Sequence, residues 1–195
     1  ILLRAGVDTS VRDIHGWTAL HWASRMGHAN IINTLLHETG TTMIDARDKN
    51  GMTPLMLTVN QSSDCVSLLL AAGANIDEQN LWGQTMMMMC AEEGKSATGL
   101  ATVLLLHRAN VKLRDRDGAT VIHYAARDGN RYLIRQMLMA LSVPEARQLL
   151  SWRDRFGARA IDEAEIHGHE GTREVLHMTM FGTEKEAASL AMLGN

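Results

Sequence analysis

The most unusual stretch of this 195-residue chain is a run of soft sulfur groups, Met86 to Met89 followed by Cys90. Cu(I) prefers thioether and thiolate ligands, and at helical spacing Met86, Met89 and Cys90 would share one face. Two structural interpretations compete with a copper site. Flexible methionines can fill irregular gaps in a core, or Met88 can belong to a partly exposed docking patch. The choice depends on the element that carries the run.

Histidine and acidic side chains raise the question of other chemistry. His167, His169 and His177 have a partial likeness to a zinc site, but they lack cysteines and a tetrahedral ligand spacing. The sequence shows no P-loop, no Ser/His/Asp elbow and no paired carboxylates. Four acidic residues are interpreted as solvated helix faces: Glu92, Glu93, Asp162 and Glu163. The sequence therefore predicts no enzyme, no metal site and no cofactor.

Composition and charge limit the partners and the cellular location that we expect for this chain. A net charge of −3 and a pI near 6.3 give no basic footprint for nucleic acid. Two cysteines, Cys65 and Cys90, are too few for a disulfide framework, and we expect them to be reduced core residues. No apolar run approaches the ~18 residues of a membrane span. We expect a cytoplasmic or nuclear segment that is excised from a longer protein, possible sources including a membrane receptor.

The elements that position these residues follow a repeat. Five glycines lie 35, 32, 35 and 39 residues apart, and they are Gly16, Gly51, Gly83, Gly118 and Gly157. A second glycine follows eleven residues later in four units, at Gly27, Gly94, Gly129 and Gly168, with Ser62 at this place in the second unit. A period of this length predicts stacked supersecondary units.

Each unit shows one physical plan. Asp or Asn, two variable residues and Gly predict a tight turn. Thr follows as a helix N-cap, a short apolar helix runs to the second glycine, and a second helix follows it. Neither helix can bury its apolar face alone, so the units must stack.

These segments resemble the ankyrin repeat. The signature is carried by TALHWA at 18–23, TPLMLT at 53–58 and TVIHYA at 120–125, and by the GH pairs at 27–28 and 168–169. The resemblance implies an all-α solenoid of helix pairs joined by short hairpin turns. It also implies structural roles for His21 and His123, and core positions for the methionine run.

The expected organisation follows from this register. Residues 1–12 are predicted to be the tail of a truncated first repeat, and 13–182 to hold five repeats that start near 13, 48, 80, 115 and 154. The segment 142–152 is predicted to be a helical insert, opened by a Ser142–Glu145 capping box, which serves as plain elaboration or as a partner contact. Residues 183–195 are predicted to form a C-terminal capping helix.

In ankyrin stacks the turn tips and the ends of the first helices line a concave face that binds proteins. The resemblance places a set of residues on that face: Ile14, His15, Trp17, Arg25, Met26, Lys49, Asn50, Met52, Asn60, Gln61, Leu81, Trp82, Gln84, Glu92, Glu93, Arg116, Asp117, Arg127 and Asp128. Trp17 and Trp82 are either partner contacts, since tryptophan is enriched in binding hot spots, or packing on the adjacent hairpin. Trp22 and Tyr124 are predicted to be core residues.

Within the family, three features resemble the Notch intracellular ankyrin domain. These are the expanded stretch 37–57, the missing mid-repeat glycine of the second unit, and the spacing of 104–129. The resemblance implies a non-catalytic scaffold that docks on a CSL-type transcription factor and forms a groove for a Mastermind-type coactivator helix. The alternatives are a regulatory or substrate-recruiting module of a larger enzyme, or a stand-alone adaptor or effector.

Overall fold

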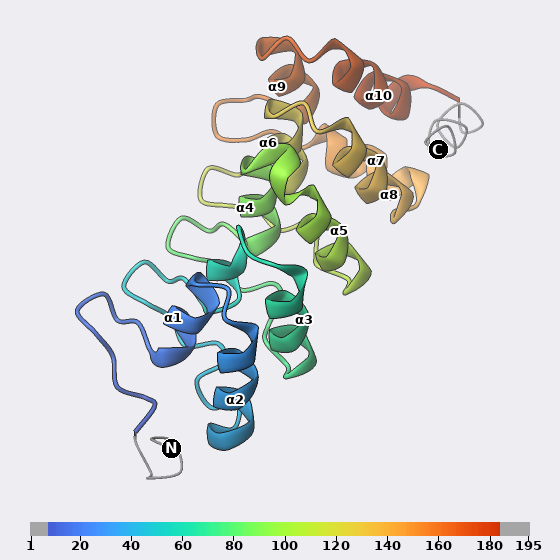
Figure 1. Ribbon diagram of the computed structural model, residues 1–195. Coiled ribbons are helices and arrows are strands. Elements are labelled where there is room, and N and C mark those ends of the chain that lie inside the picture. The colour runs from blue at the N-terminus through green and yellow to red at the C-terminus, as the bar shows by residue number, and fades with distance from the viewer. Residues whose placement is uncertain (1–7, 184–195) are drawn as a thin grey trace. The chain divides into compact units, whose positions relative to one another are not determined.

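Helix pairs in chain order build the protein, as a computed structural model shows (Figure 1). The structure describes residues 8–183, and it contains no strand in that range. The chain divides into two compact units between Met86 and Met87. This all-helical architecture confirms the predicted solenoid class.

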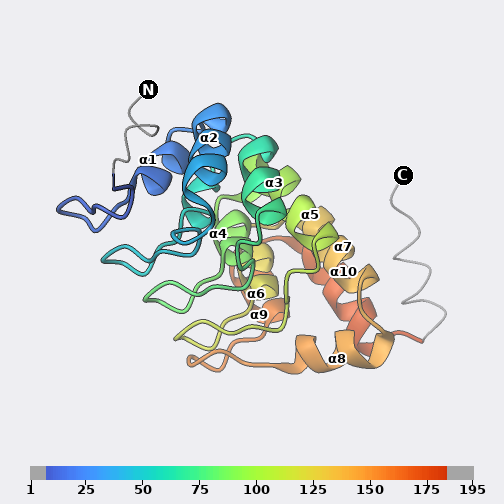
Figure 2. The same ribbon diagram turned by 90° about the horizontal axis from the view of Figure 1, so that it is seen from below.

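The first unit holds α1 (Ala19–Arg25), α2 (Ala29–Thr39), the 3₁₀ turn η2 (Met56–Thr58) and α3 (Ser63–Ala71). Helix α4 (Met86–Glu92) starts at the boundary. The second unit continues with η3 (Gly94–Ala97), α5 (Thr98–Leu106), α6 (Val121–Arg127), α7 (Arg131–Met139), α8 (Val143–Ser151), α9 (Ala160–Ile166) and α10 (Glu170–Phe181). Within each unit the loops before the first helices project to one side of the helices (Figure 2).

Threonine and histidine together start two of the first helices. The Nδ1 atom of His21 accepts from the backbone N–H of Thr18 at 3.1 Å and lies 2.9 Å from its hydroxyl. Thr120 and His123 repeat this arrangement at 3.1 and 3.0 Å. Because Nδ1 accepts from a backbone N–H, the ring proton sits on Nε2, and in His21 it points to the Met52 carbonyl at 3.2 Å. The structural role predicted for these histidines is present in both units.

Glycine ends the first helices where the neighbouring repeat comes close. Gly94 has φ +70° and Gly129 also has φ +70°, a left-handed conformation that favours glycine. A Cβ at Gly94 would lie 2.6 Å from the Asp128 carboxylate, and one at Gly129 would lie 2.5 Å from the His169 ring. The backbone angle therefore favours glycine at both positions, and a Cβ would also force the neighbouring side chain to move.

The second repeat departs from the predicted plan. Its first helix is reduced to η2, although the pattern predicts a helix up to position 62. Ser62 carries a Cβ, and its backbone is extended (φ −66°, ψ 150°) as the N-cap of α3. The chain therefore leaves the first helix early and enters the second one without a left-handed residue.

Three of the four methionines in the run lie in the core, and Met89 is half-buried. Met86, Met87 and Met88 are at most 2% exposed, and Cys90 is fully buried. This burial contradicts a docking patch through Met88 and agrees with the core interpretation. Desolvation of the buried thiol, with a smaller effect of Glu93, raises the pKa of Cys90 to about 12, so this group is a thiol rather than a thiolate at neutral pH.

Two other expectations about burial are wrong. Trp22 is 44% exposed rather than in the core, and its indole Nε1 donates to Asp13 at 3.1 Å. Glu163 is only 7% exposed rather than solvated, because its carboxylate accepts from Arg127 Nε at 3.1 Å. Tyr124 is 9% exposed, as expected of a core residue, and its hydroxyl donates to Asp115 at 2.7 Å.

Helix α8 lies in the 39-residue interval between the turn glycines Gly118 and Gly157. Ser142 and Glu145 form a reciprocal capping box at its start, and α8 packs against α10. Lys112 Nζ donates to Glu145 at 2.7 Å, and this hydrogen bond together with that of Ser142 lowers the pKa of Glu145 to about 2.

The predicted capping helix falls at 183–195, almost wholly outside the described residues. No helix in the described part of the chain combines the length and apolar character needed to cross a membrane.

Candidate protein-interaction surface

An acidic or amide side chain holds each turn tip. In the first tip, Asp13 Oδ1 accepts the backbone N–H groups of His15 at 2.8 Å and Trp17 at 2.9 Å. The same pair of bonds, to the second and fourth residues onward, recurs at every tip; the acceptors are Asp48, Asn80, Asp115 and Asp154. The tips are therefore fixed in shape, because each side chain satisfies two backbone donors of its own turn.

Backbone hydrogen bonds also join neighbouring tips. In the first unit, Lys49 N–H donates to the His15 carbonyl at 3.0 Å and Leu81 N–H donates to the Asn50 carbonyl at 2.9 Å. In the second unit, Arg155 N–H donates to the Asp117 carbonyl at 2.7 Å. The residue just after the turn Asp or Asn thus bonds to the preceding tip, which aligns the tips within each unit.

Arginine residues one position before the turn add a clamp that sequence reasoning missed. Arg12 Nη1 donates to the carbonyl of Gly16 in its own tip at 2.9 Å and to the carbonyl of Arg47 in the next repeat at 2.7 Å. Arg114 bonds in the same way to Gly118 and Arg153. The sequence feature that could have revealed these arginine contacts is an Arg–Asp pair that recurs at 12–13, 47–48, 114–115 and 153–154.

The structure leaves every residue of the predicted face outside the core. Thirteen are exposed: Ile14, His15, Arg25, Met26, Lys49, Asn50, Asn60, Leu81, Trp82, Glu92, Glu93, Arg116 and Arg127. Six are half-buried: Trp17, Met52, Gln61, Gln84, Asp117 and Asp128. The members of this set up to Gln84 belong to the first unit, and those from Glu92 onward belong to the second.

The two candidate tryptophans differ in environment. Trp17 donates from Nε1 to Asp48 Oδ2 at 2.8 Å, and its ring meets that of Trp22 edge-on at 4.7 Å between centroids. These contacts match the alternative of packing on the adjacent hairpin. Trp82 is 54% exposed, and Leu81 beside it is 44% exposed. Trp82 therefore presents a large apolar surface on a tip of fixed shape.

Phe156 is a second aromatic residue of this kind, and sequence reasoning missed it. It precedes the turn glycine of the fifth repeat, which is the position that Trp82 holds in the third. Its ring is 73% exposed, and the Arg155 guanidinium lies 4.6 Å from the ring centre. The register of the repeats was the signal that could have found it.

Polar residues at the ends of the first helices are partly engaged within each unit. Gln61 donates from Nε2 to the Arg25 carbonyl at 3.0 Å. Arg127 forms the ion pair with Glu163, whose hydrogen bond raises the pKa of the arginine further. These residues contribute less free hydrogen-bonding capacity than their exposure suggests.

The described residues hold no group of three or more His, Cys, Asp or Glu side chains that could bind a metal ion. Burial lowers the pKa of His21 and of His123, so both are neutral structural side chains at pH 7.

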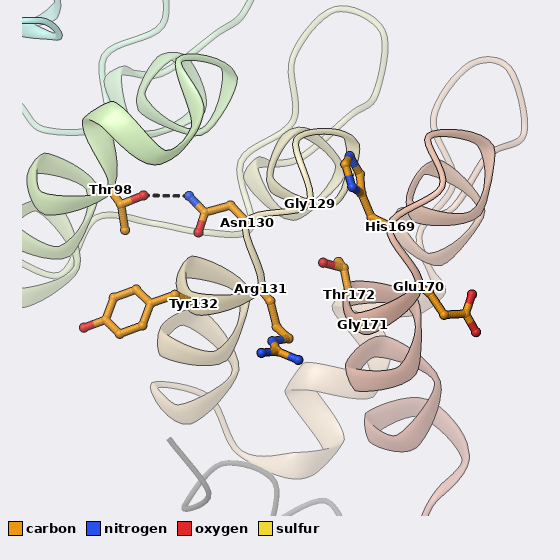
Figure 3. Close-up of a pocket in the computed structure, with 9 residues that line it drawn as sticks. All are labelled: Thr98, Gly129, Asn130, Arg131, Tyr132, His169, Glu170, Gly171 and Thr172. Carbon is orange, nitrogen blue, oxygen red and sulfur yellow. Dashed lines mark hydrogen bonds between the residues drawn. The ribbon is translucent and has the colours of Figure 1, made fainter. Parts of the chain in front are cut away.

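A hollow of about 560 Å³ lies in the second unit, at the start of α7 and α10 (Figure 3). None of the predicted face residues lines it. Its lining comprises Thr98, Gly129, Asn130, Arg131, Tyr132, His169, Glu170, Gly171 and Thr172.

Aligned tips, paired helices and glycine-ended first helices define a class of protein, the array of stacked helical repeats. The family model for ankyrin repeats in three copies matches residues 1–80 and 60–146. The chain belongs to the ankyrin-repeat family.

Several curated proteins are similar to this chain. It is 32% identical to the Nuclear factor NF-kappa-B p105 subunit of Gallus gallus, over 66% of this chain and 13% of the relative. It is 30% identical to Inversin of Gallus gallus, over 90% of this chain and 16% of the relative. It is also 30% identical to the B-cell lymphoma 3 protein homolog of Mus musculus, over 71% of this chain and 31% of the relative. The chain spans less than a third of the length of each of these relatives.

Proposed function

We propose that this chain is a non-catalytic module that binds a protein partner through its turn tips. The observation that carries the proposal is the exposure of Trp82 at 54% on a tip whose backbone is held by Asn80. Tryptophan contributes strongly to binding when a partner covers it. A fixed tip also reduces the conformational entropy lost on binding.

The character of the tips supports a protein partner. Ile14 is 79% exposed and Leu81 44% exposed, and the exposed Lys49 lies on the tip that bonds to both of theirs. An apolar centre with a polar rim is the usual composition of a protein interface. The net charge of −3 does not favour direct contact with nucleic acid.

The resemblance to Notch suggests a specific form of this function. In that form the chain docks on a CSL-type DNA-bound factor and helps to bind a Mastermind-type helix, in the nucleus. Similarity to a protein named as a nuclear factor supports a nuclear setting of this kind. A module of a larger enzyme, or a stand-alone adaptor, is the alternative, since this chain matches only part of each relative named above.

A mobility-shift assay tests both levels of the proposal. The chain is combined with a CSL-type factor on its DNA site and with a Mastermind-type peptide. We expect a supershift that needs all components, and Trp82→Ala to weaken it more than tenfold, because a buried tryptophan anchor contributes about 2 kcal/mol or more.

The control variant is Leu106→Ala, which removes a side chain that is 78% exposed at the end of α5, away from the tips. It should leave the supershift unchanged. Absence of any supershift with a folded chain would reject the Notch-type form. Partner capture that is insensitive to Trp82→Ala would reject the tip surface itself.

A further inference from the structure

The hollow at the start of α7 and α10 is lined by hydrogen-bond donors that meet no acceptor in the part of the chain that the structure describes. Helix α10 is twelve residues long and begins at Glu170. Among the described residues, the backbone N–H groups of Glu170 and Gly171 meet no acceptor, whereas those of Thr172 and Arg173 both donate to the His169 carbonyl. Free N–H groups and the helix dipole make this end attractive to an anion.

The Thr172 side chain points to a ligand independently of the helix terminus. Thr172 is only 3% exposed, and its hydroxyl has no hydrogen-bond partner in the described part of the chain. Figure 3 shows the hydroxyl oxygen directed from α10 toward the first turn of α7, into the hollow that Thr172 lines. A hydroxyl that faces the hollow without a protein partner can donate to an acceptor placed there.

An arginine supplies positive charge beside these donors. Arg131 is exposed at the first position of α7 and forms no ion pair within residues 8–183. Its Nη1 atom lies 3.2 Å from the point where a Cβ on Gly171 would stand. The absence of a side chain at Gly171 therefore lets the guanidinium reach the first turn of α10.

The one acidic residue that lines the hollow is turned away from it. Glu170 points outward in Figure 3, and its carboxylate accepts from Arg173 Nε at 3.0 Å. His169 donates from Nε2 to the Arg127 carbonyl at 3.0 Å. This hydrogen bond holds the His169 ring beside Gly129. The interior of the hollow thus presents donors rather than acceptors at the start of α10.

We propose that this hollow binds a phosphate group, held by the Arg131 guanidinium, the Thr172 hydroxyl and the free N–H groups of Glu170 and Gly171. Arginine and helix N-termini both match the several acceptor oxygens of a phosphate. The volume of about 560 Å³ exceeds that of the bare ion, so the group can be free phosphate or part of a phosphorylated side chain.

Titration of the ¹⁵N-labelled chain, followed by NMR at constant ionic strength, tests this site. One arm uses inorganic phosphate and the other uses N-acetyl-phosphoserine amide. We expect saturable shifts of the Glu170, Gly171 and Thr172 amides in at least one arm, and the tighter arm identifies the source of the phosphate. No saturable shift in either arm, or equal binding of acetate, would overturn the proposal.

Three variants locate the binding. Arg131→Gln should weaken phosphate about tenfold or more, because a charge-assisted bond is lost. Thr172→Val should weaken phosphate binding several-fold without lowering the melting temperature, since the lost hydroxyl has no partner within residues 8–183. Gly171→Ala should also weaken it, because the new Cβ displaces the guanidinium.

Arg116→Gln is the control of equal charge, since Arg116 lies on a turn tip outside the hollow. Its affinity for phosphate should match that of the unmodified chain. Equal weakening by Arg116→Gln and Arg131→Gln would indicate attraction by net charge alone and would overturn the site.

Discussion

At the scale of single residues, two buried histidines link stability to pH. His21 and His123 are at most 1% exposed, and burial lowers the pKa of each below the ordinary value near 6.5. Below pH 6.5 the unfolded chain therefore binds protons that the folded chain does not. The contribution of these groups to the unfolding free energy is complete above pH 6.5 and is lost as pH falls through the folded pKa values.

We therefore expect the melting temperature to fall by several degrees between pH 7.5 and pH 5.5, since each kcal/mol corresponds to about 2–4 °C in a chain of this size. The double variant His21→Gln, His123→Gln should be less stable at pH 7.5 but should show a flatter pH dependence. His37→Gln is the control, because that side chain is 84% exposed. An unchanged pH dependence in the double variant would contradict the assignment.

Individual residues also show where sequence reasoning about the site succeeds and where it stops. The repeat register places Trp82 on a turn tip, and the same register could have identified Phe156. It cannot separate Trp82 from Trp17, because the Trp17 environment depends on Asp48, one repeat away. Glu163 was misjudged for the same reason, since its partner Arg127 lies 36 positions earlier.

At the scale of elements, the turn between α6 and α7 depends on a glycine. Gly129→Ala would place a Cβ at φ +70° and 2.5 Å from the His169 ring. The left-handed conformation alone costs about 1–2 kcal/mol for a residue with a Cβ, so we expect a loss of unfolding free energy of at least that size. Urea titration followed by circular dichroism measures it.

Gly99→Ala provides the matched comparison. Gly99 lies in α5, and a Cβ there would meet nothing within 4 Å. We expect a gain of at most about 1 kcal/mol, because alanine loses less backbone entropy than glycine in a helix. Similar losses for both variants would mean that glycine content, rather than the geometry at Gly129, controls stability.

The elements themselves could be predicted closely where their start and end signals are local. Thr120 and Gly129 bracket α6, and both signals stand in the sequence. The shortening of the second repeat to η2 was not predicted, because a missing glycine removes an end signal without showing what replaces it. The Ser142–Glu145 box, which is local, is present as the pattern indicates.

At the scale of the whole molecule, hydrogen bonds between repeats of the described residues join neighbours in the chain. Side-chain hydrogen bonds between repeats of the described chain span 28 residues, from Asn80 to Met52, up to 42, from His169 to Arg127. This distance is about one repeat. Stability in such an array approximates a sum of repeat and interface contributions. The sequence period predicts this arrangement, whereas the division between Met86 and Met87 has no evident sequence signal.

Hydrogen exchange measured by mass spectrometry tests this locality. In Gly129→Ala we expect amide protection to fall in α6, α7, α9 and α10, since they lie in the altered repeat and its neighbour. Protection in α1 and α2 should stay as in the unmodified chain. An equal loss in α1 and α2 would show that the whole chain unfolds as one cooperative body.

Burial of the methionine run has a consequence for oxidative damage. Met86, Met87 and Met88 are shielded in the folded chain, whereas Met26 and Met139 are each 53% exposed. Peroxide should therefore convert the exposed thioethers to sulfoxides first, without harm to the core. Sulfoxide at the buried run would require transient opening of the surrounding structure, and its polarity would then hinder reclosure. Sulfoxide at the buried methionines would therefore show that the surrounding structure had opened.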